Sequence, residues 1–111
     1  MRWIEIISLR CPASLNMRFV DELLKELGKP DPPEHLEGIR IYRHSIVETD
    51  LSIHIHWKSE SGNQSKSPLG LRVSSALKDL GLLNHSVWVE TTAKEFPHSD
   101  AGPGPPGHPG A

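Results

Sequence analysis

Three histidines stand in two neighbouring segments that both have the composition of a β-strand. His54 and His56 are two residues apart in the segment 51–58, and His44 lies in the preceding segment, 39–47. Residues two apart in a strand project from the same face of a sheet, with Cα atoms ~6.7 Å apart. An imidazole near neutral pH can act as a general base or bind a metal. This pair of segments is therefore where a functional site is predicted.

The length of the turn between the two segments decides which side chains meet. A turn over residues 48–50 would place His44 opposite His54, about 5 Å away across the strands. It would also place Tyr42 opposite His56. This register collects the apolar side chains on one face, whereas a shift of one residue would mix polar and apolar side chains. We expect a ligand-binding site lined by Tyr42, His44, His54 and His56, with His54 or His56 as the candidate general base.

Three imidazoles at these separations could also converge on one zinc ion. Glu5, in the first predicted strand, could lie on the same face and would add a fourth ligand or a general base. However, a His-x-His pattern is short, and strand histidines are more often solvated or part of an interface. A zinc site of His44, His54, His56 and Glu5 is therefore the less favoured alternative, and no cofactor is predicted.

Four strands and two helices must position these side chains. β-Branched and apolar segments bounded by turn residues predict strands over residues 2–10, 39–47, 51–58 and 85–91. Apolar residues at three- and four-residue spacing predict two helices between them. The first begins after Ser14 or Asn16 and extends through Leu27, and the second begins with Ser67 as its N-cap and ends at Gly81.

The order strand–helix–strand–strand–helix–strand predicts a ferredoxin-like α+β fold, in which a four-stranded antiparallel sheet carries both helices on one face. The first and third strands are then central. This domain takes up residues 1–91, and residues 92–111, rich in glycine and proline, are expected to form a disordered tail. Two helices can cover only one face of the sheet, so the other face is left open.

The open face is expected to be too apolar to remain in water. Besides the histidines, it is predicted to carry Trp3, Ile7, Leu9, Tyr42 and Ile46. Two sheets packed face to face across a two-fold axis would bury these side chains. We therefore expect a homodimer through the open face that binds a small molecule. A structural or regulatory dimer without catalysis, whose interface histidines respond to mild acid, is an open alternative.

Three segments carry a resemblance to a known superfamily. They are the strand 38–43, the strand end 55–59 with its Trp57, and the helix opening at Ser67 and Pro68. Together they resemble the antibiotic-biosynthesis monooxygenase branch of the dimeric α+β barrels, where a strand with a tryptophan near its end precedes a loop and a Ser-Pro helix start. The resemblance implies paired open sheets, a small aromatic or quinone-like ligand, and a pocket between sheet and helices. It makes a cofactor-independent monooxygenase or isomerase a further alternative.

Three residues outside the histidine segments are minor candidates. Cys11 precedes a predicted helix, whose N-terminus could stabilise a thiolate. The stretch 9–12 is similar to the Cys-Pro element of bacterial sulfur-carrier proteins, but Ser14 stands where that family has a second proline, so a structural cysteine is favoured. His85 and Trp88, in the fourth strand, are candidates for a pocket rim, and Trp88 is favoured as a core or dimer contact.

Composition and charge exclude several partners. The 12 lysines and arginines against 14 acidic residues give a net charge of −2. Without a basic stripe, neither nucleic acid nor an anionic membrane surface is an expected partner. No apolar run approaches the ~18 residues of a membrane-spanning helix, and the first residues do not have the pattern of a signal peptide. A single cysteine allows no internal disulfide, so a cytoplasmic location is predicted.

Overall fold

The computed structural model of the chain describes residues 1–13, 17–27, 32–59 and 64–97. Their elements follow the predicted order and confirm the α+β fold. The bounds are β1 Arg2–Arg10, α1 Met17–Leu27, β2 Leu36–Arg43, β3 Asp50–Lys58, α2 Pro68–Leu77 with a 3-10 turn at Lys78–Leu80, and β4 Leu82–Val89. Most of the predicted tail, residues 98–111, lies outside the described residues.

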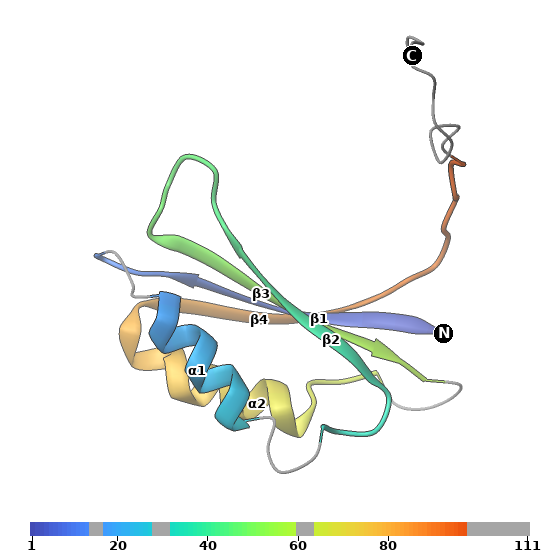
Figure 1. The fold of residues 1–111 in the computed structure, drawn as a ribbon, viewed down its shortest axis with the longest axis horizontal. Helices are drawn as coiled ribbons and strands as arrows, with labels where there is room; N and C mark the ends of the chain where they lie inside the picture. The colour runs from blue at the N-terminus through green and yellow to red at the C-terminus, as the bar shows by residue number, and fades with distance from the viewer. Residues whose placement is uncertain (14–16, 28–31, 60–63, 98–111) are drawn as a thin grey trace, which may run out of the picture.

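The four strands form one antiparallel sheet in the order β2-β3-β1-β4, with β1 and β3 central as predicted. Both helices pack against one face, and the opposite face is uncovered in the described chain (Figure 1). The core lies between the helices and the sheet and is built mainly from aliphatic side chains. Within the described residues, no helix has the length and apolar character needed to cross a membrane.

The start of α2 is fixed by the predicted N-cap. The Ser67 hydroxyl oxygen accepts a hydrogen bond of 2.9 Å from the Gly70 amide, and Pro68 takes the first helical position, where its missing N–H is not needed. The first helix ends at Leu27 as predicted, whereas Ser14 and Asn16, its candidate caps, lie outside the described residues.

The prediction of which face of β1 is open was wrong. Trp3, Ile7 and Leu9 point toward the helices and are buried in the core. Their neighbours Ile4 and Ile6 take the open face instead. The reason is that β1 carries large apolar side chains at both odd and even positions, so its own pattern does not identify the inward face.

The predicted register of β2 and β3 was also wrong, by an even number of residues. Ile41 pairs with Ile53, so paired positions sum to 94 instead of 98. Residues 44–49 form a longer loop, in which Ile46 is 82% exposed and therefore not part of the sheet face. Because an even shift keeps each side chain on its face, the apolar and polar faces of both strands were still assigned correctly.

Candidate functional site

The open face of the sheet is an ordered grid, because the registers of all four strands align its side chains in rows. One row contains Tyr42, Ser52, Ser8 and Asn84, taken in order from β2 through β3 and β1 to β4. We call these four residues the polar row. The next row is Arg40, His54, Ile6 and Ser86, and the one after it is Gly38, His56, Ile4 and Trp88.

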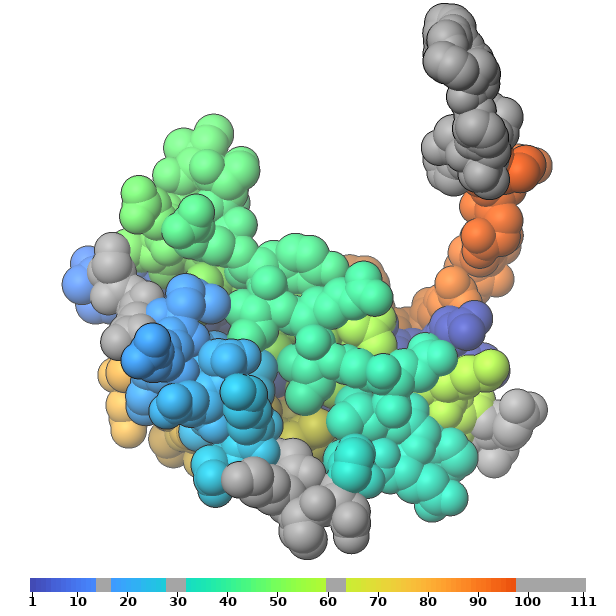
Figure 2. Space-filling view, viewed as in Figure 1, coloured from blue at the N-terminus to red at the C-terminus, as the bar shows by residue number. Residues whose placement is uncertain are grey.

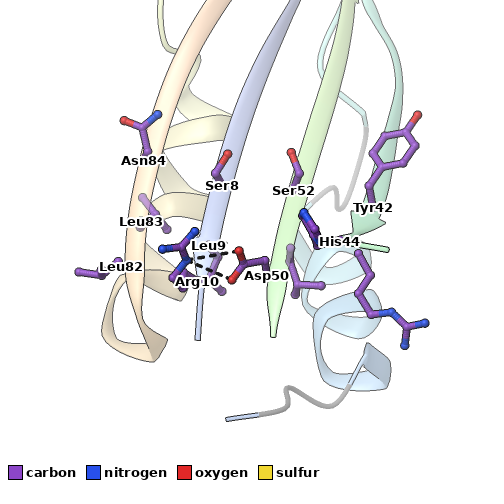
Figure 3. A pocket seen from close by; sticks show the side chains of 12 residues that line it. Ser8, Leu9, Arg10, Tyr42, His44, Asp50, Ser52, Leu82, Leu83 and Asn84 are labelled. Atoms are coloured by element: carbon purple, nitrogen blue, oxygen red, sulfur yellow. Dashed lines mark hydrogen bonds and ion pairs between the residues drawn. The ribbon is translucent and has the colours of Figure 1, made fainter. Parts of the chain in front are cut away.

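A hollow of about 500 Å³ lies over the polar row, toward the end of the sheet where β1 finishes. We call it the first hollow. Figure 3 shows the four side chains of the polar row side by side on their four strands. The rim is set by Arg10, whose Nε donates to both carboxylate oxygens of Asp50 at 3.2 and 3.3 Å, and by the exposed Leu82. A volume of this size is that of a typical small-molecule site.

The polar row presents unused hydrogen-bonding groups. Within the described chain, the side chains of Tyr42, Ser8 and Asn84 form no hydrogen bond to another residue, whereas the Ser52 hydroxyl lies 2.9 Å from Nε2 of His54. The row therefore offers hydroxyl and amide groups without a formal charge, which can each donate and accept. Such a surface suits a flat ligand with several oxygen atoms.

His54 lies on the open face beside the polar row, and its neighbours differ from those expected. It pairs with Arg40 across the strands, and its ring lies 4.7 Å from the ring of Tyr42. Burial, and then the nearby His56 ring, lower the pKa of His54 below its usual 6.5. His54 is therefore neutral at pH 7 and available as a proton acceptor.

His44 is separated from the other two histidines. It lies beyond the end of β2, where its Nδ1 accepts hydrogen bonds of 3.0 Å from the amides of both Ile46 and Val47. The side chain thus caps the loop between β2 and β3 and also lines the first hollow. The predicted pairing of His44 with His54 is wrong, because the loop is longer than residues 48–50.

His56 lies at the other end of the open face. It contributes to a second hollow of about 280 Å³, near Trp88 and Ile4. Its Nε2 atom is buried and has no hydrogen-bond partner among the described residues. Tyr42 is opposite Ser52, so the predicted contact between Tyr42 and His56 is absent.

The structure does not support the predicted zinc site, because its four predicted ligands lie apart. Glu5 points toward the helices, on the face opposite His54 and His56, and His44 is held in the loop. Among the residues that the structure describes, no three or more His, Cys, Asp or Glu side chains are placed to bind one metal ion. The four predicted ligands are therefore not brought together.

Glu5 is instead the centre of a buried polar cluster under α2, which the sequence did not predict. Its fully buried carboxylate accepts hydrogen bonds from Trp57 Nε1 at 2.8 Å, from the Ser67 amide at 3.0 Å and from the Ser67 hydroxyl. His85 Nε2 lies 2.7 Å from the same carboxylate, and His85 Nδ1 lies 3.2 Å from the Ser74 hydroxyl. We call Glu5, Trp57, Ser67, Ser74 and His85 the Glu5 cluster.

The geometry of the Glu5 cluster indicates a structural role. The contacts are consistent with His85 Nε2 donating a hydrogen bond to the Glu5 carboxylate and Nδ1 accepting a hydrogen bond from the Ser74 hydroxyl. Every polar group named here then has a partner, and the carboxylate sits at the favourable N-terminal end of α2.

The resemblance implied a pocket between sheet and helices, and this cluster fills that position. His85 is therefore a buried anchor and not a pocket rim, and Trp88, 59% exposed, is not a core residue.

No local sequence signal reveals this cluster, because the register of β1 with β3 must be known first. The odd positions of β3 are uniformly apolar, and that register places the odd positions of β1 in the same core. Glu5 would then have been recognised as a buried carboxylate that needs donors. The nearest candidates would have been a helix N-cap, a tryptophan and a histidine, which Ser67, Trp57 and His85 provide.

Cys11 is buried at the end of β1, as the structural interpretation predicted. Burial, and then the negative charge of Asp50, raise the pKa of the thiol. We therefore expect native protein at pH 7.5 to react with iodoacetamide at least about tenfold more slowly than protein unfolded in urea. Mass spectrometry of the alkylated chain over time checks this, and equal rates in both states would show that the thiol is accessible.

Comparison with known proteins gives the fold but no family. The chain matches no protein-family model, and no curated protein matches its sequence. Solved structures are similar. Rv0793 from Mycobacterium tuberculosis has 13% sequence identity and a TM-score of 0.55, and the match covers 86% of this chain and 100% of that chain. A mutant of SnoaB, a cofactor-independent oxygenase from Streptomyces nogalater, has 11% identity and a TM-score of 0.59, and the match covers 87% of this chain and 98% of that chain. A third is a candidate antibiotic biosynthesis monooxygenase from Deinococcus radiodurans (14%, 0.57, 86% and 99%). The predicted fold-level resemblance to this branch is confirmed.

Proposed function

We propose that the chain forms a homodimer through its open sheet faces and binds a small, flat, oxygen-bearing molecule in the first hollow. The observation that carries the proposal is that hollow, with about 500 Å³ over four neutral polar side chains. A planar ligand with carbonyl or hydroxyl groups could hydrogen-bond to Tyr42, Ser52, Ser8 and Asn84 at successive strand spacings of about 4.8 Å. The structural neighbours, one described as a cofactor-independent oxygenase, make a quinone-like ligand a reasonable first class to test.

Dimerisation is supported by what the open face exposes. Trp88 and Leu82 on β4 and Tyr42 on β2 are exposed large side chains at its two edges, and Ile4 and Ile6 lie between them. Four strands of about nine residues cover roughly 19 Å by 30 Å in projection. This is near the ~800 Å² per partner of a stable interface once side-chain relief is included. The hairpin of β2 and β3 and the segment 90–97 rise at opposite ends of this face and frame it (Figure 2).

The first experiment is native mass spectrometry of untagged protein, purified without a chelator or a nickel column. We expect a dimer, with a retained small molecule or with capacity to bind 2,3-dimethyl-1,4-naphthoquinone, a neutral diketone without a thiol-reactive ring position. Ser8 lies in the middle of the polar row, so Ser8→Leu should fill the hollow and lower ligand occupancy at least about tenfold. The variant should remain a dimer.

Ser75→Leu is the matched control, because it adds the same side chain to an exposed position of α2. It should bind ligand like the wild type. A monomer at micromolar concentration would contradict the proposed interface. A dimer in which Ser8→Leu and Ser75→Leu bind the naphthoquinone equally would place the ligand elsewhere, and a dimer without any binding would favour the structural or regulatory alternative.

A catalytic role is the second candidate, and His54 is the observation that favours it. Its neutral imidazole lies beside Tyr42 and Ser52 at the edge of the first hollow. A base there could remove a proton from a phenolic or enolic ligand, the step that a cofactor-independent monooxygenase or isomerase would need. Substituting His54→Gln would then abolish turnover of a bound ligand while leaving its affinity within a few fold.

A further inference from the structure

The loop of residues 44–49, between β2 and β3, carries an apolar tip above the open face. Figure 2 shows this hairpin rising from the sheet, and its base lines the first hollow. Near the tip, Ile46 is 82% exposed, and its neighbour Val47 is exposed as well. The loop therefore holds apolar side chains at the edge of the proposed ligand site, on the side that a second sheet would occupy.

Hydrogen bonds at the base of the loop hold this tip in place. Nδ1 of His44 accepts from the amides of Ile46 and Val47, both at 3.0 Å. The Thr49 carbonyl accepts from the Cys11 amide at 3.0 Å, which ties the loop to the end of β1. A tip that is already ordered loses little conformational entropy when another molecule covers it, so it is suited to binding.

Leu82, at the start of β4, is the apolar counterpart of this tip. It lines the first hollow from the opposite edge of the sheet and is 76% exposed. Within the described chain, Ile46 and Leu82 are the two most exposed large apolar side chains. Because β2 and β4 are three strand spacings of about 4.8 Å apart, these side chains do not meet within one chain. A second copy can bring them together.

The direction of the two-fold axis decides which edges of the two sheets meet. For sheets packed face to face, the axis lies between them, either parallel to the strands or across them. The order β2-β3-β1-β4 means that a parallel axis places β4 of one protomer over β2 of its partner, with each row over its own counterpart. Ile46 then meets Leu82 of the partner subunit, twice in the dimer. An axis across the strands would instead place Leu82 over the partner's Glu90.

The sizes of the side chains in one row fit the parallel axis. At the β4 edge of this row Trp88 is 59% exposed, and at its β2 edge Gly38 has no side chain. A Cβ atom built on Gly38 would meet no atom within 4 Å. The parallel axis places Trp88 over Gly38 of the partner subunit, where the indole has room. Large side chains that face small ones allow two layers to interdigitate.

The charges near the first hollow favour the same axis. With it, Arg10 faces the partner's Asp50, so the ion pair within each chain is joined to its symmetry mate with opposite charges adjacent. An axis across the strands would oppose Arg10 to the partner's Arg2. At the far end the parallel axis does bring Lys58 near the partner's Arg2. There Glu37, 3.2 Å from Arg2 in its own chain, offsets the repulsion.

We infer that the loop 44–49 of each protomer closes the first hollow of its partner, with Ile46 packed against the partner's Leu82. This inference rests on the proposed dimer and adds a wall that the ligand site of one chain lacks. Three extended residues on each side let the loop reach roughly 10 Å, and sheets packed face to face are about 10 Å apart. The ligand then lies between the polar row and an apolar wall from the second chain, which selects a ring system that is polar at one edge and hydrocarbon at the other.

Cysteine crosslinking of the full-length chain tests the contact. With a short bis-maleimide, the double variant Ile46→Cys/Leu82→Cys should give at least about tenfold more covalent dimer on a denaturing gel than either single variant. The single variants should not crosslink, because the axis keeps identical side chains at opposite edges. Wild-type protein is the control for Cys11, which is buried. The pair Ile46→Cys/Lys58→Cys reports the axis across the strands and should not crosslink.

Ligand binding gives a second readout. Ile46→Ser removes the apolar wall and should lower the occupancy of 2,3-dimethyl-1,4-naphthoquinone about fivefold or more. Native mass spectrometry measures this on the dimer peak alone, at a protein concentration at which the variant is dimeric. Leu71→Ser is the matched control, because it removes a half-exposed aliphatic side chain from α2, away from the open face. It should bind the naphthoquinone like the wild type.

The outcomes distinguish a failure of this contact from a failure of the proposed dimer. A dimer with crosslinking between positions 46 and 82 and weakened binding by Ile46→Ser supports the inference. It is overturned if the protein is a dimer in which Ile46→Cys/Leu82→Cys does not crosslink, in which the pair with Lys58→Cys does, or in which Ile46→Ser binds like the wild type. Each of these results leaves the dimer itself in place. A monomeric wild type would contradict the proposed dimer and the inference with it.

Discussion

Replacing Glu5 with alanine is expected to lower the free energy of unfolding by about 3–5 kcal/mol, a large part of the stability of a domain this size. The carboxylate is fully buried and is the shared acceptor for Trp57, Ser67 and His85. Its removal leaves all of these groups without a partner and opens a cavity under α2. Urea unfolding, with the slope of the transition checked for constancy, measures the loss.

Two further variants make this result specific. Glu37→Ala breaks only the half-exposed ion pair with Arg2 and should cost less than about 1 kcal/mol. Gly70→Ala should approach the effect of Glu5→Ala, because its Cβ would lie 2.1 Å from Oε1 of Glu5 and 3.0 Å from Cε1 of His85. If Glu5→Ala cost no more than Glu37→Ala, the Glu5 cluster would not be what holds α2 on the sheet.

Mild acid is expected to dissociate the proposed dimer, with the dimer dissociation constant rising about tenfold or more between pH 7.5 and pH 5.5. Among the described residues, Arg40 is the one charged group beside His54 in the open-face rows, and it is also basic. Its neighbours are Arg40 and Tyr42 on β2, Ser52 and His56 on β3, and Ile6 on β1. Asp50, farther along β3 on that face, is already paired with Arg10. A second sheet placed over the His54 ring would therefore have to meet it in its neutral form.

The direction of the pH effect follows from the lowered pKa of His54. Because the folded protein holds this imidazole below its usual pKa of 6.5, the folded chain binds fewer protons than the unfolded chain in mildly acidic solution. The stabilisation is fully present above pH 6.5 and is lost as the pH falls through the folded-state value. Covering the open face would lower the pKa of His54 further, so dimerisation has the same sign of pH dependence.

Light scattering coupled to size-exclusion chromatography at several pH values checks this expectation. Replacing both His54 and His56 with glutamine should give a dimer whose dissociation constant varies less than about threefold over the same pH range. His35→Asn, in the exposed turn before β2, is the control and should keep the wild-type pH dependence. A wild-type dimer of constant mass down to pH 5 would show that these histidines are not buried in the interface.

Sequence patterns were sufficient for the fold because most elements have one dominant signal. The alternation in β3, the Ser67-Pro68 start of α2 and the strand–helix order lead directly to a sheet with central β1 and β3. Even the wrong register of β2 kept the right faces, since the shift was even. What the pattern could not provide was the length of the loop after Arg43. Ile46 and Val47 are β-branched and favour a strand, but His44 stabilises the loop instead.

The site was predicted less completely, for a physical reason that concerns β1. The sequence places His54, Tyr42 and His56 on the open face, and the structure agrees with that placement. The polar row also needs Ser8 and Asn84, which come close only through the registers of β1 with β3 and β4. Glu5 was assigned to the wrong face because both faces of β1 are apolar. Pairings between residues distant in the chain are not encoded in any local pattern.

The Glu5 cluster also bears on how the chain reaches its fold during synthesis. β1 leaves the ribosome before the other strands of this domain, yet both of its neighbours, β3 and β4, come from the second half of the domain. Glu5 has no hydrogen-bond partner of its cluster until Trp57, Ser67 and finally His85, eighty positions later in the chain, have been synthesised. Until then an apolar strand with a charged centre has neither edge paired, and contacts of such long range form slowly. The nascent chain therefore cannot complete its domain from the N-terminus onward. The sheet and the Glu5 cluster are complete only when β4 has been synthesised and pairs with β1.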